Sequence, residues 1–271
     1  MKKAFAFFLP FLLAARAAVP LAAGETLTLA STTSTLDSGL FDALIPPFEK
    51  KFDCAVKVIA VGSGQAMRLA RDGNADVLLV HDRAAEEKFV ADGFGVERLA
   101  VMHNDFVLVG PPVDPAGVRA LKAAEAFGKI AAAGAGFVSR GDDSGTHKKE
   151  LKLWQAGGIQ PSGAWYMESG TGMEATLRIA NEKATYCLVD RATWLAHRKE
   201  SDALEVLAQG DANLFNPYSV IVVAPAKFPW LNTRLATRFA EFIRSVEGQA
   251  IIRDFGRERF GAPLFFPDVV R

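Results

Sequence analysis

The sequence predicts an α/β protein of two lobes, each a mostly parallel sheet flanked by helices, with two hinge crossings of the chain between them. Short apolar strands alternate with amphipathic helical segments, which is the pattern of parallel sheets. Two similar strands, Asn104–Pro112 and Asn216–Pro225, each begin with Asn and stop at Pro, and they enclose a second α/β set. A single doubly wound domain remains the alternative at this point.

The elements of the first lobe follow one another in a regular order. A strand at 26–31 precedes a helix at 38–52, in which Pro46 and Pro47 are expected to kink or interrupt the helix. A strand at 55–61 then leads into a short helix that Gly73 closes. The continuous apolar run of 75–81 is typical of a fully buried strand. Strand, helix, strand, helix, strand predicts a parallel sheet.

The second lobe repeats this alternation between the two similar strands. Its predicted segments lie at 134–140, 145–158, 169–183, 184–190 and 191–199. Two C-terminal helices, 231–245 and 247–255, are expected to pack back on the first lobe. The expected division is therefore lobe one at 25–108 and 217–271, and lobe two at 109–216.

Residues 1–24 read as a secretory signal peptide. Lys2 and Lys3 precede an apolar run of 12 residues, Ala4 to Ala15, and small residues follow. A bilayer span needs roughly 20 residues, so a membrane anchor is the weaker interpretation. Cleavage is expected after Gly24, with Ala17 as the alternative. No Cys lies near this site, so we expect an exported periplasmic protein without a lipid anchor.

The amino-acid composition argues against two classes of function, nucleic-acid binding and metal binding. The 31 basic residues balance the 31 acidic ones, which argues against a nucleic-acid binder driven by net charge. The two cysteines, Cys54 and Cys187, fit no metal-binding spacing, and the four histidines are scattered. No metal site and no cofactor are predicted. The two cysteines are expected to be free thiols in different lobes.

The strand-to-helix turns carry the functional signal. Four of them, at 31–39, 62–65, 139–147 and 169–173, are rich in Ser, Thr and Gly. A helix N-terminus exposes unpaired N–H groups, and Ser or Thr there ordinarily caps the helix. Four such turns with one arginine, Arg140, predict a site where N–H, O–H and guanidinium donors converge on an oxyanion.

The turn "SRGDDSGTH", Ser139 to His147, has rival interpretations. A serine hydrolase would need Ser144, His147 and Asp143 to converge, but all three stand at the start of one helix and point in different directions. The turn contains none of three known motifs: the nucleophile elbow, the Walker loop and the calcium loop. An anion cradle remains, in which Asp142 or Asp143 orients Arg140 or caps the helix.

Six segments together resemble the tungstate-binding periplasmic components of ABC transporters. They are "STTSTLDSGL", "VGSGQAM", "ADVLLVHDRAAEEKFVADGFG", "SRGDDSGTHKKELKLW", "MESGTGMEATLRIANEKATYCLVDRATWLA" and "GQAIIRDFG". The resemblance implies a two-lobed periplasmic binding protein fold that closes over a tetrahedral oxyanion and docks on a membrane permease. Ser31 stands where the family usually has threonine. We expect a monomeric binding protein that is not an enzyme.

The ligand is expected to be tungstate, with molybdate as an anion that the sequence does not separate from it. The expected ligand-binding residues are Thr32, Thr33, Ser34, Ser63, Arg140, Ser144, Gly145, Thr146, Thr171, Gly172 and Met173, the last through its backbone N–H. Phosphate is the rival ligand, because Asp82 could accept its proton; the alternative role of Asp82 is to cap the following helix. A secreted phosphatase-like enzyme is the rival of another class.

Overall fold

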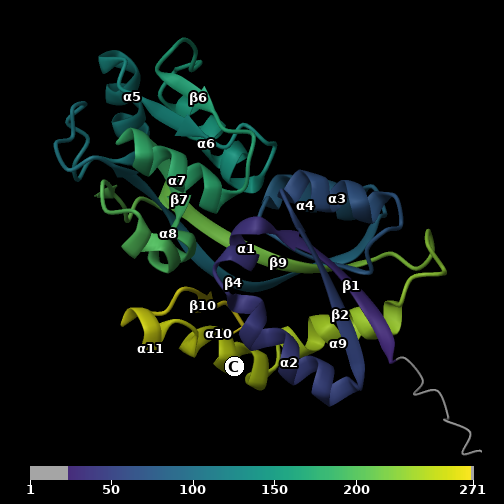
Figure 1. Cartoon of the computed structure of the whole chain (residues 1–271). Helices are drawn as coiled ribbons and strands as arrows, with labels where there is room; N and C mark the ends of the chain where they lie inside the picture. The colour runs from purple at the N-terminus through teal and green to yellow at the C-terminus, as the bar shows by residue number, and fades with distance from the viewer. Residues whose placement is uncertain (1–23, 270–271) are drawn as a thin grey trace, which may run out of the picture.

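The computed structural model describes residues 24–269, so the predicted signal peptide lies, except for Gly24, outside the described residues. Its strands join in the order β2-β1-β3-β9-β4-β7-β5-β6, with β8 and β10 paired to β4. Figure 1 shows two bodies, one with β1, β2, α2 and α9 and the other with β6, α5, α6 and α7, and the long strands β4 and β9 run between them. The two-lobed α/β fold predicted from the sequence is confirmed.

Each lobe has a core of three parallel strands, to which antiparallel strands are added. Their bounds are β1 Glu25–Thr32, β2 Cys54–Val61, β3 Val77–Val80, β4 Gly95–Gly110, β5 Phe137–Ser139, β6 Tyr166–Glu168, β7 Tyr186–Asp190, β8 Glu205–Ala208, β9 Phe215–Val223 and β10 Phe266–Pro267. In lobe one β1 pairs in parallel with β2 and β3. In lobe two β5 pairs in parallel with β6 and β7. Strands β4 and β9 are antiparallel to each other and to the neighbours that they meet in each lobe.

Helices cover both faces of each sheet. Their bounds are α1 Thr33–Asp37, α2 Leu40–Phe52, α3 Ser63–Arg71, α4 Arg83–Ala91, α5 Ala123–Ala133, α6 Gly145–Ala156, α7 Met173–Lys183, α8 Arg191–His197, α9 Thr233–Ile243, α10 Val246–Asp254 and α11 Arg257–Phe260. In lobe one, apolar residues of α2, α9 and α10 pack on one face, and those of α3 and α4 pack on the other. In lobe two, α5 and α6 share one face, and α7 and α8 share the other.

The chain passes between the lobes along β4 and β9. Strand β4 pairs with β9 as far as Asp105, opposite Phe215. From Phe106, opposite Asp190, it pairs with β7 of the other lobe. One long strand therefore belongs to both sheets, and its partner changes at Asp105 and Phe106.

Two expectations about single elements have different outcomes. Helix α2 runs without a break through Pro46 and Pro47, which contradicts the expected interruption. The carbonyls of Asp42 and Ala43, four residues before the prolines, lose their N–H partners, and Asp42 lies on the exposed face, where water can replace them. Cys54 on β2 and Cys187 on β7 are both free, as predicted. Among the described residues no helix is long and apolar enough to cross a membrane.

Candidate functional site

The Ser- and Thr-rich turns meet between the two lobes. Arg140, after β5, donates from Nη2 to Oγ1 of Thr33 in the other lobe at 3.2 Å. A methyl group added at Gly172, which precedes α7, would lie 3.5 Å from the same Thr33 oxygen. Three turns that are far apart in the sequence therefore come together at Thr33.

The start of α3 lies against the start of α6. A methyl group added at Gly62 would lie 3.1 Å from Cα of Ser144. One added at Gly145 would lie 3.1 Å from Oγ of Ser63 and 2.7 Å from Cε1 of His81. These glycines have no side chain, which permits the close approach of the two helix N-termini.

Three of the predicted ligand residues have a buried polar atom with no hydrogen-bond partner among the described residues. These atoms are Oγ of Ser63, Nε of Arg140 and Oγ1 of Thr146; Oδ2 of Asp82 and Nε2 of His147 nearby are also without one. Leaving a buried donor unsatisfied costs about 1–3 kcal/mol, so most buried polar groups are paired. Three unsatisfied groups on adjoining turns fit a ligand that accepts hydrogen bonds.

Arg140 is held by one of the two acids that the sequence proposed. Its side chain is only 2% exposed, and its Nη2 lies 2.5 Å from Oδ2 of Asp142. The other carboxylate oxygen of Asp142 accepts from the backbone N–H of Ser144 at 3.2 Å. Asp143 instead pairs with Arg68 at 3.1 Å and with Lys148 at 3.4 Å. Asp142 thus orients the guanidinium and leaves Nε free.

The other predicted residues differ in their surroundings. Thr32 caps α1 and bonds through Oγ1 to the hydroxyls of Ser34 at 3.2 Å and Thr35 at 2.7 Å. Ser144 caps α6 by accepting from the N–H of His147 at 3.2 Å. Its hydroxyl therefore serves the helix, and no Ser-His-Asp triad forms.

The turn before α7 differs from the other three in the surroundings of its residues. Thr171 is exposed, and its hydroxyl bonds to Ser169 at 3.2 Å. The side chain of Met173 is fully buried in an apolar cluster with Val138 and Leu177. It has no hydrogen-bond donor, so the predicted donor of this residue is its backbone N–H. The contact of Gly172 with Thr33 still places this turn beside the site.

Asp82 caps α4, the second of the two roles considered for it. Its Oδ1 accepts from the N–H of Ala85 at 3.4 Å, and its Oδ2 lies 3.0 Å from Nζ of Lys148 in the other lobe. Apart from this ion pair, Oδ2 is buried and accepts no hydrogen bond within the described residues. Lys148 competes with a ligand for this oxygen, which weakens the case for Asp82 as the acceptor of a phosphate proton.

A buried polar network beneath the turns was missed by the sequence reasoning. Asn216 of β9 donates to Oδ1 of Asn104 of β4 at 2.7 Å, and its own Oδ1 lies 2.9 Å from Nδ1 of His81. Asn104 donates to Oδ1 of Asp190 at 3.3 Å. The two asparagines that begin the similar strands are thus partners at the hinge. Their matching positions were the available signal.

His81 is an uncharged member of this network. Burial lowers its pKa to about 4, while the hydrogen bond with Asn216 acts in the opposite direction. The imidazole is neutral near pH 7 and therefore adds no positive charge beside Gly145. Burial also raises the pKa of Asp190 above its usual range, although its bonds to Thr193 lower it.

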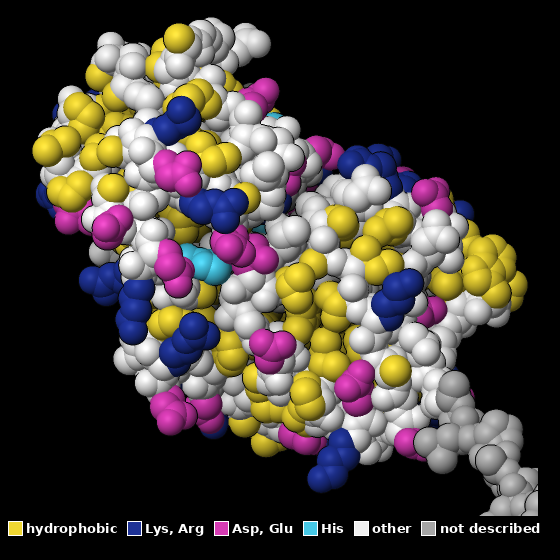
Figure 2. All heavy atoms as spheres, viewed as in Figure 1, with side chains coloured by type: hydrophobic (Ala, Val, Ile, Leu, Met, Phe, Trp, Pro, Cys, Tyr) yellow, Lys and Arg dark blue, Asp and Glu magenta, His cyan; other side chains and the backbone are white. Residues whose placement is uncertain are grey.

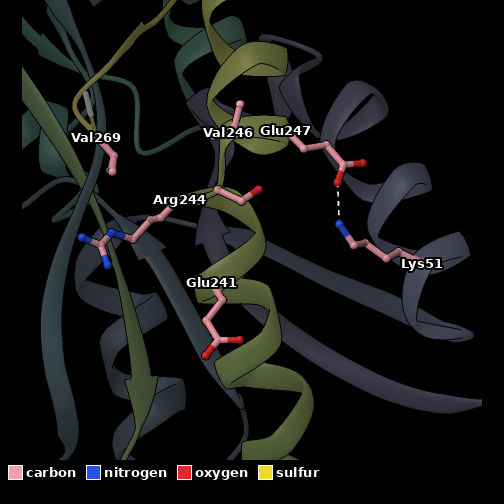
Figure 3. Close-up of a pocket in the computed structure, with 7 residues that line it drawn as sticks. Lys51, Glu241, Arg244, Val246, Glu247 and Val269 are labelled. Atoms are coloured by element: carbon pink, nitrogen blue, oxygen red, sulfur yellow. Dashed lines mark hydrogen bonds and ion pairs between the residues drawn. The ribbon is translucent and has the colours of Figure 1, made fainter. Parts of the chain in front are cut away.

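A hollow on lobe one lacks these features. It has a volume of about 500 Å³ and lies among α2, α9 and α10, and Figure 3 shows Lys51, Glu241, Arg244 and Glu247 around it. Lys51 and Glu247 pair at 2.6 Å with about half of each side chain exposed. Exposed ion pairs of this kind contribute little to the stability of the fold. None of the four turns reaches this hollow.

The family model described as "PBP superfamily domain" matches residues 19–247. The tungstate-binding protein TupA of Peptoclostridium acidaminophilum is 47% identical over 91% of this chain and 87% of its own length. The chain belongs to the PBP superfamily, and within it to the TupA family. Two solved structures extend this result. A tungstate ABC transporter protein from Geobacter sulfurreducens is 50% identical over 85% of this chain and 99% of its own, with a TM-score of 0.78.

The second solved relative is the tungstate-binding protein TupA of Desulfovibrio alaskensis. It is 43% identical over 90% of this chain and 99% of its own, with a TM-score of 0.75. Members of the TupA family thus share both the sequence and the two-lobed fold of this chain. The family resemblance drawn from the six sequence segments is confirmed.

Proposed function

We propose that this chain captures tungstate between its two lobes and delivers it to the membrane permease of an ABC transporter. The observation that carries the proposal is the junction of the four turns, where Ser63, Arg140 and Thr146 keep unsatisfied donors. The names of the TupA relatives supply the identity of the anion.

The proposed ligand set is the one expected from the sequence. Arg140 and Thr33 have the strongest structural support, followed by Ser63, Gly145 and Thr146. Thr32, Ser34, Ser144, Gly172 and the backbone N–H of Met173 adjoin them, whereas Thr171 has the weakest support because it is exposed. We also keep as proposals the lobe bounds 25–108 with 217–271 and 109–216, which the partner exchange of β4 supports.

Tungstate suits this junction better than phosphate does. Tungstate is an acceptor only, whereas phosphate near neutral pH can keep a proton that needs an acceptor. The carboxylates nearest the turns, Asp82 and Asp142, already have partners. The junction therefore offers mainly donors, and a protonated ligand would have to compete with Lys148 for Oδ2 of Asp82, the one oxygen of these two carboxylates that accepts no hydrogen bond.

The proposal also places the protein in the periplasm as a monomeric binding protein without a cofactor. Its relatives are named for tungstate binding, which supports a role in transport rather than catalysis. Incubation with phosphate esters should give no turnover. Hydrolysis of the esters faster than the uncatalysed reaction would support the phosphatase alternative.

Calorimetric titration of one purified sample with tungstate, molybdate, sulfate and phosphate tests the proposal. We expect tungstate to bind far more tightly than sulfate or phosphate. Molybdate, equal to tungstate in charge and close in size, is the decisive comparison for the identity of the cargo. Phosphate binding as tight as tungstate binding would overturn the proposal.

A further inference from the structure

A cavity of about 430 Å³ opens between the lobes beside the candidate site. Gly145, which lies against both Ser63 and His81, forms part of its wall with His81, and Asn216, Pro217 and Tyr218 of β9 form another part. The cavity is thus distinct from the junction of the turns but shares Gly145 with it.

Positive side chains from both lobes, together with one acid, Asp82, line this cavity. Helix α6 contributes Lys148, Lys149 and Lys152, and lobe one contributes Arg83 and Arg98. Three of the five cations are paired with acids: Lys148 with Asp82, Arg98 with Glu86 and Arg83 with Glu87. Lys149 and Lys152 form no ion pair within the described part of the chain.

The two unpaired lysines lie close enough to influence each other. Lys149 donates to the backbone carbonyls of Asn213 and Phe215 at 3.0 Å each, which fixes its ammonium group at the edge of the hinge. Burial and the charge of Lys152 lower the pKa of Lys149 below its usual range, while the charge of Asp211 acts in the opposite direction. Placing an anion between these ammonium groups would relieve their repulsion.

We infer that this cavity is a second, weaker binding site for a small inorganic oxyanion. Lys149 and Lys152 attract the anion, and the shared wall at Gly145 brings it next to the ligand turns. A cleft lined by charges of one sign raises the local concentration of its counter-ion and speeds association. The role as an outer site for tungstate rests on the proposed function, whereas oxyanion binding in the cavity does not.

A sulfate titration followed by NMR tests the binding itself. Backbone amide shifts of Lys149 and Lys152 are recorded with and without one equivalent of tungstate, which fills only the tighter site, in the wild type, in Lys152→Gln and in Lys129→Gln. Lys129 is an exposed lysine on α5, so its variant changes the net charge equally. We expect saturable shifts in the wild type and in Lys129→Gln and their loss in Lys152→Gln. Shifts that do not saturate, or that persist in Lys152→Gln, would overturn the inference.

Stopped-flow kinetics with tungstate test the role as an outer site. At about 20 mM salt the association rate of Lys152→Gln should fall roughly three- to tenfold below that of Lys129→Gln, and about 0.5 M salt should remove the difference. The dissociation rate should not change. Equal association rates in both variants at low salt would refute the outer-site role. A wild type that fails to bind tungstate would instead contradict the proposed function and leave the sulfate result standing.

Discussion

Replacing Arg140 by lysine tests the candidate site most directly. The guanidinium uses Nη2 for Asp142 at 2.5 Å and for Thr33 at 3.2 Å, and its Nε remains available for a ligand. A lysine ammonium is a single donor centre that cannot occupy these directions at once. A hydrogen bond to a charged group is worth about 1.5–3 kcal/mol. Loss of one such bond predicts a dissociation constant about ten- to hundredfold higher.

Arg68→Lys is the matched control. Arg68 also pairs with an acid of this turn, Asp143 at 3.1 Å, but about half of each side chain is exposed. An exposed pair of this kind is worth about 0–1 kcal/mol, so the control should bind tungstate nearly as the wild type does. Calorimetry gives the affinities, and melting without ligand shows whether both variants are folded. Arg140→Lys with wild-type affinity would remove Arg140 from the site.

Three further predictions concern ligand, backbone and pH. Tungstate at about 100 times its dissociation constant should stabilise the fold by about 2.7 kcal/mol in thermal melting, and an equal effect of sulfate would contradict the selectivity. Gly145→Ala would place a methyl group 2.7 Å from His81 and should weaken tungstate binding by about tenfold, whereas Gly128→Ala, which meets no atom within 4 Å, should not. Asp37→Asn should leave stability unchanged at low pH and raise it at high pH. Burial, with the nearby charge of Glu174, raises the pKa of Asp37 from 3.8 to about 6, so the stability present below pH 3.8 is lost as the pH rises through 6. Because Asp37 is only partly buried, we expect a gain of about 1 kcal/mol rather than the full 3 kcal/mol, measured by denaturant unfolding at about pH 8.

The sequence predicted the parts of the fold that depend on local pattern. The alternation of short apolar runs with amphipathic helical segments predicted the parallel strands. The predicted helices 231–245 and 247–255 correspond to α9 and α10. Strand β4 was predicted from Asn104 but begins at Gly95. Its first half has several partly exposed residues, so it lacks the continuous apolar run that identified the second half.

Contacts between the lobes could not be read from the sequence. Arg68 and Asp143 are 75 residues apart, and Arg140 and Thr33 are 107 apart. Nothing local distinguishes Asp142, which holds Arg140, from Asp143, which does not. The choice depends on which acid faces the guanidinium after the two lobes come together. The four turns were predictable because each carries its own Ser, Thr and Gly residues.

The pairing of Arg140 with Asp142 has a consequence for how a dianion is held. Because the two charges nearly cancel, the net charge of the junction is small, and the anion must be stabilised largely by N–H and O–H donors. The N-termini of α3, α6 and α7 supply such donors, each carrying roughly half a positive charge. Fixed buried dipoles are screened little by salt, whereas exposed charges are screened strongly. Dissociation of tungstate should therefore depend weakly on ionic strength, while its association, governed by Lys149 and Lys152, should depend on it strongly.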